Sequence, residues 1–257
     1  MPGVFITGTD TDVGKTVVSA GLAACLSLNY GQSVCAYKPL QTGSESDADM
    51  ARLKALTKAL CNGIETVCDV MLPVPASPWV SDFLAYSQKT TPQKTIIDPS
   101  ALLQKARQLE TQFDTLIVEG AGGLFVPITA AYDMVNLASD LKYPILLVAR
   151  PDLGTINHTR LSLEAILKRN LPVLGVVVSA MPNAKQLAAY EFQQAIETLP
   201  EVFEKLLPVP VLAYLPDFGF HQPDRVFQAS DLAYFEPIAS AVLQAVQTKG
   251  YPVACKI

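Results

Sequence analysis

A Gly-Lys-Thr tripeptide near the start of the chain has the residue types that bind a nucleoside triphosphate. It ends the run GTDTDVGKT at 8–16, which follows a short apolar stretch, Gly3–Thr7, and leads into a segment of helical period. In this strand–turn–helix context, backbone N–H groups and the helix N-terminus bind phosphate. Lys15 would neutralise the β- and γ-phosphates, and Thr16 would ligate Mg²⁺. The sequence therefore predicts a γ-phosphate site at Gly8–Thr16.

The spacing of this loop departs from the usual pattern at one position. A Gly or Ala normally stands five residues before Gly14, whereas this chain has Thr9 there and its glycine at Gly8. The alternative is an ordinary capped helix N-terminus with a lysine in its first turn. We favour the phosphate loop because strand, glycine, Gly-Lys-Thr and helix follow in that order. The residues expected to contact the nucleotide are Asp12, Val13, Gly14, Lys15, Thr16 and Val17.

Two further segments offer carboxylates that could complete a Mg²⁺ shell. Glu119 ends an apolar stretch, where its charge would be poorly solvated without a cation, and Gly120–Gly123 then lets the backbone approach a ligand. Glu119, Gly120, Ala121 and Gly122 are predicted nucleotide contacts; a surface turn is the alternative. Asp47 and Asp49 lie near the start of a predicted helix, where capping and metal binding are equally open.

A second lysine lies at the end of another predicted strand. Lys38 stands in AYKPLQTGS, and Pro39 fixes the exit of the chain. A lysine at the carboxyl end of a parallel strand faces the ligand crevice. Beside Lys15 it would balance the charge on a transferring phosphoryl group. A solvated lysine after an edge strand is the alternative.

Short apolar runs alternate with helical segments along the chain. The predicted strands are Gly3–Thr7, Ser33–Lys38, Thr115–Glu119, Ile145–Ala149, Val173–Ser179 and Val209–Tyr214. The predicted helices are Lys15–Tyr30, Ala48–Ala59, Pro99–Thr111, Met134–Leu141, Ile156–Arg169, Ala184–Thr198 and Leu232–Gln247. This alternation predicts an α/β fold, a doubly wound, mostly parallel sheet flanked by helices, in one domain over 1–257. The proline-bearing stretch 70–99 breaks the rhythm and is interpreted as a functional loop region.

Composition narrows the function classes. A net charge of −5 argues against nucleic acid or an anionic membrane as partner. Five scattered cysteines indicate free thiols in a reducing compartment, and two histidines are too few for a zinc site. The apolar runs are far shorter than the roughly 18 residues that span a bilayer. We therefore expect a cytoplasmic protein.

The ordered set of motifs resembles the dethiobiotin synthetase family of phosphate-loop proteins. The loop is GTDTDVGKT at 8–16, and the lysine motif is Tyr37-Lys38-Pro39 followed by Thr42-Gly43. The strand motif VEGAGG covers 118–123, and LGTINH covers 153–158. The matches follow one another from residue 3 to about residue 180; the last third is weaker.

The resemblance implies a homodimeric enzyme that depends on Mg²⁺ and ATP. Its substrates would be 7,8-diaminopelargonate, CO₂ and ATP, and its products dethiobiotin, ADP and phosphate. One amine would capture CO₂ as a carbamate, and a carbamate oxygen would attack the γ-phosphate to give a mixed anhydride. The other amine would then close the ring.

The resemblance also assigns roles to residues. Lys38 and Lys15 would be catalytic, and Thr16, Asp49 and Glu119 would ligate the metal. Asp49 is favoured over Asp47 because Met50 and Leu53 then fall on the expected helix face. The proposed substrate contacts are Thr42, Gly154 and Asn157, the last two in a segment that reaches across the dimer.

The base end of the nucleotide differs from the family pattern. Many relatives have an asparagine that recognises adenine where this chain has Ser179-Ala180, and Pro216 would form the other wall of the pocket. A serine cannot make the same paired donor and acceptor contacts. The sequence therefore leaves the nucleotide preference open.

Other phosphate-loop proteins remain rivals to this interpretation. Partitioning ATPases have an extra lysine at the position of Asp10, and glutamine-dependent amidoligases have an added amidotransferase domain, which we do not expect within 257 residues. A non-catalytic nucleotide switch would have no use for Lys38.

Overall fold

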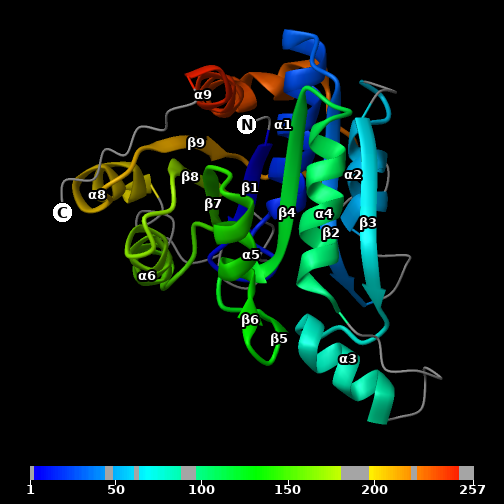
Figure 1. Cartoon of the computed structure of the whole chain (residues 1–257). Helices are drawn as coiled ribbons and strands as arrows, with labels where there is room; N and C mark the ends of the chain where they lie inside the picture. Colours follow the sequence, from blue (N-terminus) through cyan, green and yellow to red (C-terminus); the bar gives the residue numbers. More distant parts are fainter. Residues whose placement is uncertain are drawn as a thin grey trace.

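Seven parallel strands form one sheet in the computed structural model, which describes residues 3–43, 49–60, 64–87, 97–180, 197–220 and 225–248. Their order is β3-β2-β4-β1-β7-β8-β9 (Figure 1). The strands are β1 Gly3–Gly8, β2 Val34–Thr42, β3 Ile64–Leu72, β4 Thr115–Gly123, β7 Ile145–Ala149, β8 Val173–Ser179 and β9 Val211–Leu215. A separate antiparallel pair joins β5 Pro127–Thr129 to β6 Tyr132–Asp133. The predicted fold class is confirmed.

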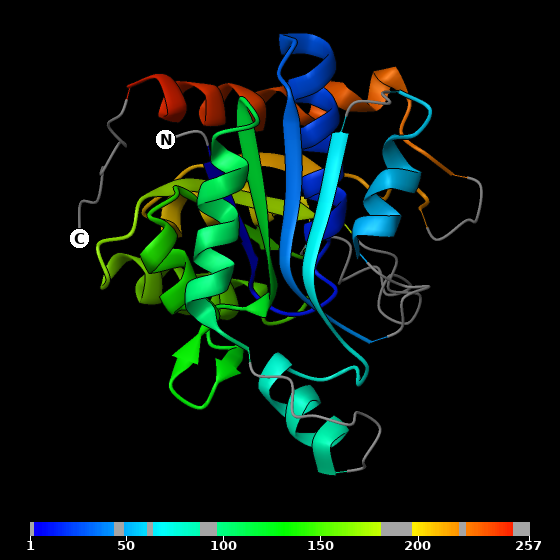
Figure 2. The same ribbon diagram turned by 45° about the vertical axis from the view of Figure 1, so that its right-hand side comes forward.

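Helices cover both faces of the sheet, with α4 in front of it and α1 and α9 behind it in Figure 2. Their bounds are α1 Lys15–Tyr30, α2 Asp49–Thr57, α3 Pro78–Ser87, α4 Pro99–Glu110, α5 Met134–Leu141, α6 Thr155–Leu167, α8 Leu199–Leu206, the 3-10 helix η2 Ala229–Phe235 and α9 Glu236–Thr248. One apolar core packs the sheet against α1, α2, η2 and α9, and the other packs it against α4, α5, α6 and α8. Along β1, Val4 and Ile6 belong to the first core and Phe5 to the second, because successive strand side chains point to opposite faces.

The centre of the sheet is β1, with β4 on one side and β7 on the other. From β1 the chain crosses over β4 to build β2 and β3, and from β4 it passes to β7 beyond β1. Ligands bind at the carboxyl ends of strands where the direction of winding changes in this way. The loop 9–14 that follows β1 lies at that point.

Two strands continue four residues beyond their predicted ends, and β1 and β9 continue one residue beyond theirs. Lys38 does not end β2, which pairs with β3 as far as Thr42, and Glu119 does not end β4, which continues to Gly123. The edge strand β3 was not predicted, because Glu65 and Asp69 interrupt its apolar pattern on a partly exposed edge.

The interpretation of 70–99 as a loop is wrong for residues 70–72, which end β3, and for Pro78–Ser87, which forms α3. Pro78 begins this helix, since a first-turn residue needs no N–H donor. Figures 1 and 2 show α3 beyond the carboxyl end of β3.

The C-terminal helices also differ from prediction. The helix predicted over Leu232–Gln247 is divided into η2 and α9, with Pro237 in the first turn of α9. Apart from its last two residues, the helix predicted over Ala184–Thr198 lies outside the described residues. The short helix α8 was not predicted.

Candidate active site

The phosphate loop curls tightly between β1 and α1. Gly14 caps α1 in the left-handed region at φ 94°, and Asp12 also has a positive φ of 53°. Only glycine adopts this region without steric cost, so Asp12 marks local strain. A side chain at Gly8 would place its Cβ 2.7 Å from the Asp10 carbonyl oxygen and 3.1 Å from Lys15 Nζ. The glycine at position 8 is therefore required by the close return of the loop.

The lysine of the loop lies inside this curl. Lys15 Nζ donates to the Asp10 carbonyl oxygen at 3.0 Å, and its side chain is buried. Burial lowers the pKa of Lys15, and the nearby positive charge of Lys38 lowers it further, against the opposing effect of Glu119. A buried ammonium with a carbonyl partner can form a stronger contact with an anion such as phosphate.

Glu119 is the centre of a buried polar cluster behind the loop. It follows Ile117 by two residues on β4 and so faces the same side of the sheet as Ile117, toward α1. Its Oε1 accepts from Thr16 Oγ1 at 3.0 Å and from Lys38 Nζ at 2.9 Å, while Oε2 accepts from Ser19 Oγ at 2.6 Å. Glu119 is 1% exposed, so these three donors take the place of water around its buried carboxyl group.

Lys38 reaches the cluster because β2 and β4 separate at their carboxyl ends. Their pairing stops at Tyr37 and Val118, one residue before Lys38 and Glu119. Pro39 has no N–H to donate. It comes after the last residue of β2 that pairs with β4, so no hydrogen bond to β4 is lost there. The gap between the strands thus accommodates both charged side chains.

Asp49 is the second carboxylate on Lys38. Their ion pair joins Lys38 Nζ to Asp49 Oδ2. Burial alone would lower the pKa of Lys38, but the charges of Glu119 and Asp49 outweigh it and raise that pKa. Asp49 begins α2, and its N–H donates to Gln41 Oε1 at 3.2 Å. The alternative ligand Asp47 lies outside the described residues.

The glycine run of β4 lies against the phosphate loop. Gly123 is in register with Gly8, and a Cβ at Gly123 would stand 3.3 Å from the Gly8 carbonyl oxygen. Gly122 has a φ of 61°, and a Cβ there would lie 2.7 Å from Val126 Cγ2 and 3.5 Å from Thr11 Cγ2. The backbone at Gly122 and Gly123 therefore comes close to the loop.

The predicted base-binding residues lie at the ends of β8 and β9, two and three strands from β1. Ser179 is in register with Leu215, and the Ala180 N–H donates to the Leu215 carbonyl oxygen at 3.0 Å. Pro216 follows directly, so the three residues occupy one stretch of the sheet edge. The Ser179 hydroxyl is buried and has no hydrogen-bond partner in the part of the chain that is described.

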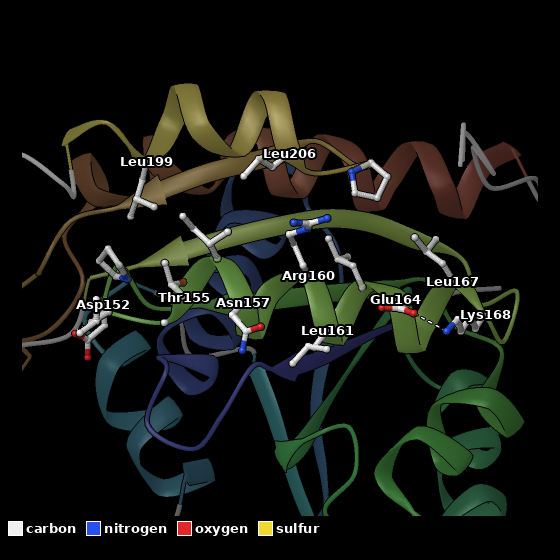
Figure 3. Close-up of a pocket in the computed structure, with 16 residues that line it drawn as sticks. Asp152, Thr155, Asn157, Arg160, Leu161, Glu164, Leu167, Lys168, Leu199 and Leu206 are labelled. Atoms are coloured by element: carbon white, nitrogen blue, oxygen red, sulfur yellow. Dashed lines mark hydrogen bonds and ion pairs between the residues drawn. The ribbon is translucent and has the colours of Figure 1, made fainter.

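The predicted substrate residues are divided between two places. Thr42 ends β2 beside the end of β3. Gly154 caps the start of α6 at φ 88°, and both Gly154 and Asn157 are exposed. They line a cavity of about 930 Å³ between α6 and α8 (Figure 3). In the described part of the chain, no hydrogen bond or ion pair connects them to Lys38 or Glu119.

Three polar residues of this region were not predicted: Ser19, Gln41 and Arg150. Ser19 could have been found, since it lies three residues after Thr16 and shares its helix face. Gln41 contacts Asp49, as described above. Arg150 follows β7 and bridges two carboxylates, with Nη2 at 3.5 Å from Asp10 Oδ2 and Nε at 3.4 Å from Asp152 Oδ2.

The cysteines that the structure describes are buried or half-buried. Cys25, Cys35 and Cys68 are free, and burial raises the pKa of both Cys25 and Cys35 to about 12. Among the residues described, no helix is long and apolar enough to cross a membrane.

Comparison with known proteins supports the prediction of an ATP-dependent enzyme. A family model described as an AAA domain matches residues 2–219. The ATP-dependent dethiobiotin synthetase BioD of Paramagnetospirillum magneticum is 39% identical over 223 residues, covering 87% of this chain and 96% of that protein. BioD of Bacillus subtilis strain 168 is 34% identical over 219 residues, covering 84% and 87%.

Solved structures share the fold at much lower identity. The cell division ATPase MinD of Pyrococcus furiosus superposes with a TM-score of 0.57 at 17% identity, covering 95% of this chain and 99% of that one. The BioD proteins are similar to this chain in sequence over most of both chains, so they indicate its family as well as its fold. The chain belongs to the ATP-dependent dethiobiotin synthetase family, and is thus an ATP-dependent ligase of biotin biosynthesis that acts on small-molecule substrates, as its motifs predict.

Proposed function

We propose that the site at the end of β1 catalyses the Mg²⁺-dependent, ATP-driven carboxylation and ring closure of 7,8-diaminopelargonate to dethiobiotin, ADP and phosphate. The convergence of Thr16, Lys38 and Asp49 around buried Glu119, next to the phosphate loop, carries this proposal. It provides oxygen ligands and a cation at the place where a γ-phosphate would lie.

The phosphate loop would hold the triphosphate through its backbone N–H groups and Lys15. To do so, Lys15 Nζ would exchange the Asp10 carbonyl oxygen for phosphate oxygens. The proposed nucleotide contacts are those predicted above: Asp12 to Val17 along the loop, Glu119 to Gly122 on β4, and Ser179, Ala180 and Pro216 at the base. Because the hydroxyl of Ser179 is free within the described structure, it can accept or donate one hydrogen bond to a base.

A divalent cation fits the donors of this site. Two carboxylates and one hydroxyl, from Asp49, Glu119 and Thr16, are hard oxygen ligands of the kind that Mg²⁺ prefers. Both carboxylates already lie on one cation, the ammonium of Lys38. In the described residues no group of three or more His, Cys, Asp or Glu could hold a metal unaided, so phosphate and water would supply the remaining ligands. When bound, Mg²⁺ would neutralise charge on the β- and γ-phosphates.

The reaction would proceed in three steps. One amine of the substrate adds to CO₂, giving a carbamate and releasing a proton. A carbamate oxygen attacks the γ-phosphorus and the bond to ADP breaks, which leaves a carbamic-phosphoric anhydride. The second amine then attacks the carbonyl carbon, phosphate leaves, and a second proton is lost.

The two lysines would act on the charge that moves through these steps. Lys38 stays protonated, since Glu119 and Asp49 raise its pKa, so its ammonium can donate to oxygens of the carbamate and of the transferring phosphoryl group. Lys15 does the same from the loop. Lys38 is held by buried Glu119 and by Asp49, so its ammonium needs little reorganisation as charge develops.

We further propose that the protein is a homodimer, with Gly154 and Asn157 of one protomer completing the substrate site of the other, and Thr42 supplying a hydroxyl from the same chain. The segment is exposed and makes no described contact with its own Lys38. Leu153, 83% exposed, and Leu161, 56% exposed, add apolar surface there. If Lys38→Ala and Asn157→Ala proteins regain activity when mixed, the partner's segment completes the site; no recovery would refute this arrangement.

Measurement of ADP release tests the whole proposal. Hydrolysis should require both 7,8-diaminopelargonate and bicarbonate, and dethiobiotin should form in equal amount. Turnover that ignores both additions would point to an ATPase or switch. We also propose that the chain acts as one domain in the cytoplasm; fractionation of cells would test the location.

A further inference from the structure

Ser19 contacts the central carboxylate of the site, yet the proposed reaction gives it no part. It lies on α1 three residues after Thr16, so the two side chains face the same side of the helix. Ser19 is fully buried, between Val18 and Ala20 of the apolar core. Its hydroxyl reaches Glu119 at 2.6 Å.

The two oxygens of Glu119 have different hydrogen-bond partners. Oε2 accepts from Ser19, on the inner side of α1. Oε1 accepts from Thr16 and Lys38, which are the proposed metal ligand and catalytic cation. Each oxygen of this buried carboxylate therefore has its own partners, and only Oε1 is directed toward the reacting groups.

The side chain of Glu119 does not set this orientation by itself. The last torsion of a glutamate has a broad energy minimum, so the carboxylate can turn at little cost. A hydroxyl bonded to a carboxylate at 2.6 Å is a short, charge-assisted hydrogen bond. Because Ser19 has no solvent to turn to, its hydroxyl keeps Oε2 in place.

We propose that Ser19 is a positioning residue, which holds Oε2 of Glu119 so that Oε1 faces Lys38 and the divalent cation. It acts through Glu119 and does not touch the substrate. This inference rests on the proposed Mg²⁺ site. Hydrogen-bond partners of metal ligands commonly affect metal affinity by about 10–100-fold, and Ser19 should do the same.

Binding of Mn²⁺ to the full chain in the presence of ADP tests this role, with free Mn²⁺ measured by electron paramagnetic resonance. Ser19→Ala removes a single oxygen atom and should weaken Mn²⁺ binding about 10–100-fold. Binding of ADP without metal should change less than about twofold, since Ser19 makes no described contact with the phosphate loop backbone. Ser19→Thr keeps the hydroxyl and should restore Mn²⁺ binding.

Ser27→Ala is the matched control, a serine of the same helix about two turns further on that is not a partner of Glu119. If Ser19→Ala does not fold, Ser19→Cys takes its place, because a thiol of similar size is a weak donor. Mn²⁺ affinity equal to that of Ser27→Ala would overturn the role of Ser19 alone. Equal losses of Mn²⁺ and metal-free ADP binding would reduce it to general support of the fold. A wild-type protein that binds no Mn²⁺ with ADP would overturn the metal site as well.

Discussion

Removal of the Lys38 ammonium should cost both stability and activity. In Lys38→Met the carboxylates of Glu119 and Asp49 lose their shared cation, while a side chain of similar length fills the space. Breaking a buried ion pair in this way costs about 3–5 kcal/mol. Glu119 keeps Thr16 and Ser19 as donors, and Asp49 is 30% exposed, so we expect about 3 kcal/mol. For a chain of this size that corresponds to a fall in Tm of about 6–12 °C.

Thermal unfolding of the apo-protein at pH 7.5 (about one unit above the reference pKa of histidine) measures this cost, with Lys54→Met as the control for an exposed lysine. Mg²⁺ with ADP should raise the Tm of Lys38→Met more than that of wild type, because the metal returns positive charge to Glu119 and Asp49. Turnover should fall at least about 100-fold. A Tm within about 2 °C of the Lys54→Met control would refute the view that Lys38 holds a buried cluster together.

Three further substitutions probe the loop. Gly8→Ala places a methyl group against the Asp10 carbonyl oxygen. Such overpacking costs about 1–3 kcal/mol, so ADP affinity measured by calorimetry should fall by about 5- to 150-fold; unchanged affinity would contradict the close return of the loop. Lys15→Met removes a buried ammonium whose pKa is lowered by burial. Just below the ordinary lysine pKa, the folded wild-type protein binds fewer protons than its unfolded state. The free energy of unfolding of wild type should therefore rise relative to that of Lys15→Met as pH rises toward about 10. The variant should have no turnover and should melt no lower than wild type at pH near 7; a lower Tm would argue against the desolvation cost. Arg150→Ala breaks two half-exposed ion pairs with Asp10 and Asp152 worth less than about 1 kcal/mol, so its Tm should stay within about 3 °C while ADP binding becomes less salt-dependent; an unaltered salt dependence would remove Arg150 from the loop's electrostatics.

Local pattern was sufficient for two strands buried along their whole length and for two helices with one continuous buried face. The helices Lys15–Tyr30 and Met134–Leu141 and the strands Ile145–Ala149 and Val173–Ser179 have the predicted bounds. Their sequences are apolar at nearly every position that faces the core, so the hydrophobic period predicts both the type of each element and its length. Prediction failed where the chain lies at an edge or contains proline: β3 has charged residues on an exposed edge, and α3 begins with the proline that suggested a loop.

The sequence by itself determined the phosphate loop, because its strand, glycines, lysine and helix are contiguous and each constrains the next. It also indicated the residue types for the rest of the site. Only the tertiary structure brings Lys38 to Glu119, since 81 residues separate them and the order of β2 and β4 in the sheet makes them neighbours. The same holds for Ser19, whose hydroxyl has a partner because α1 packs over β4. Side chains distant in sequence become one site when strand order and burial leave each charge no other partner, and no local pattern contains that information.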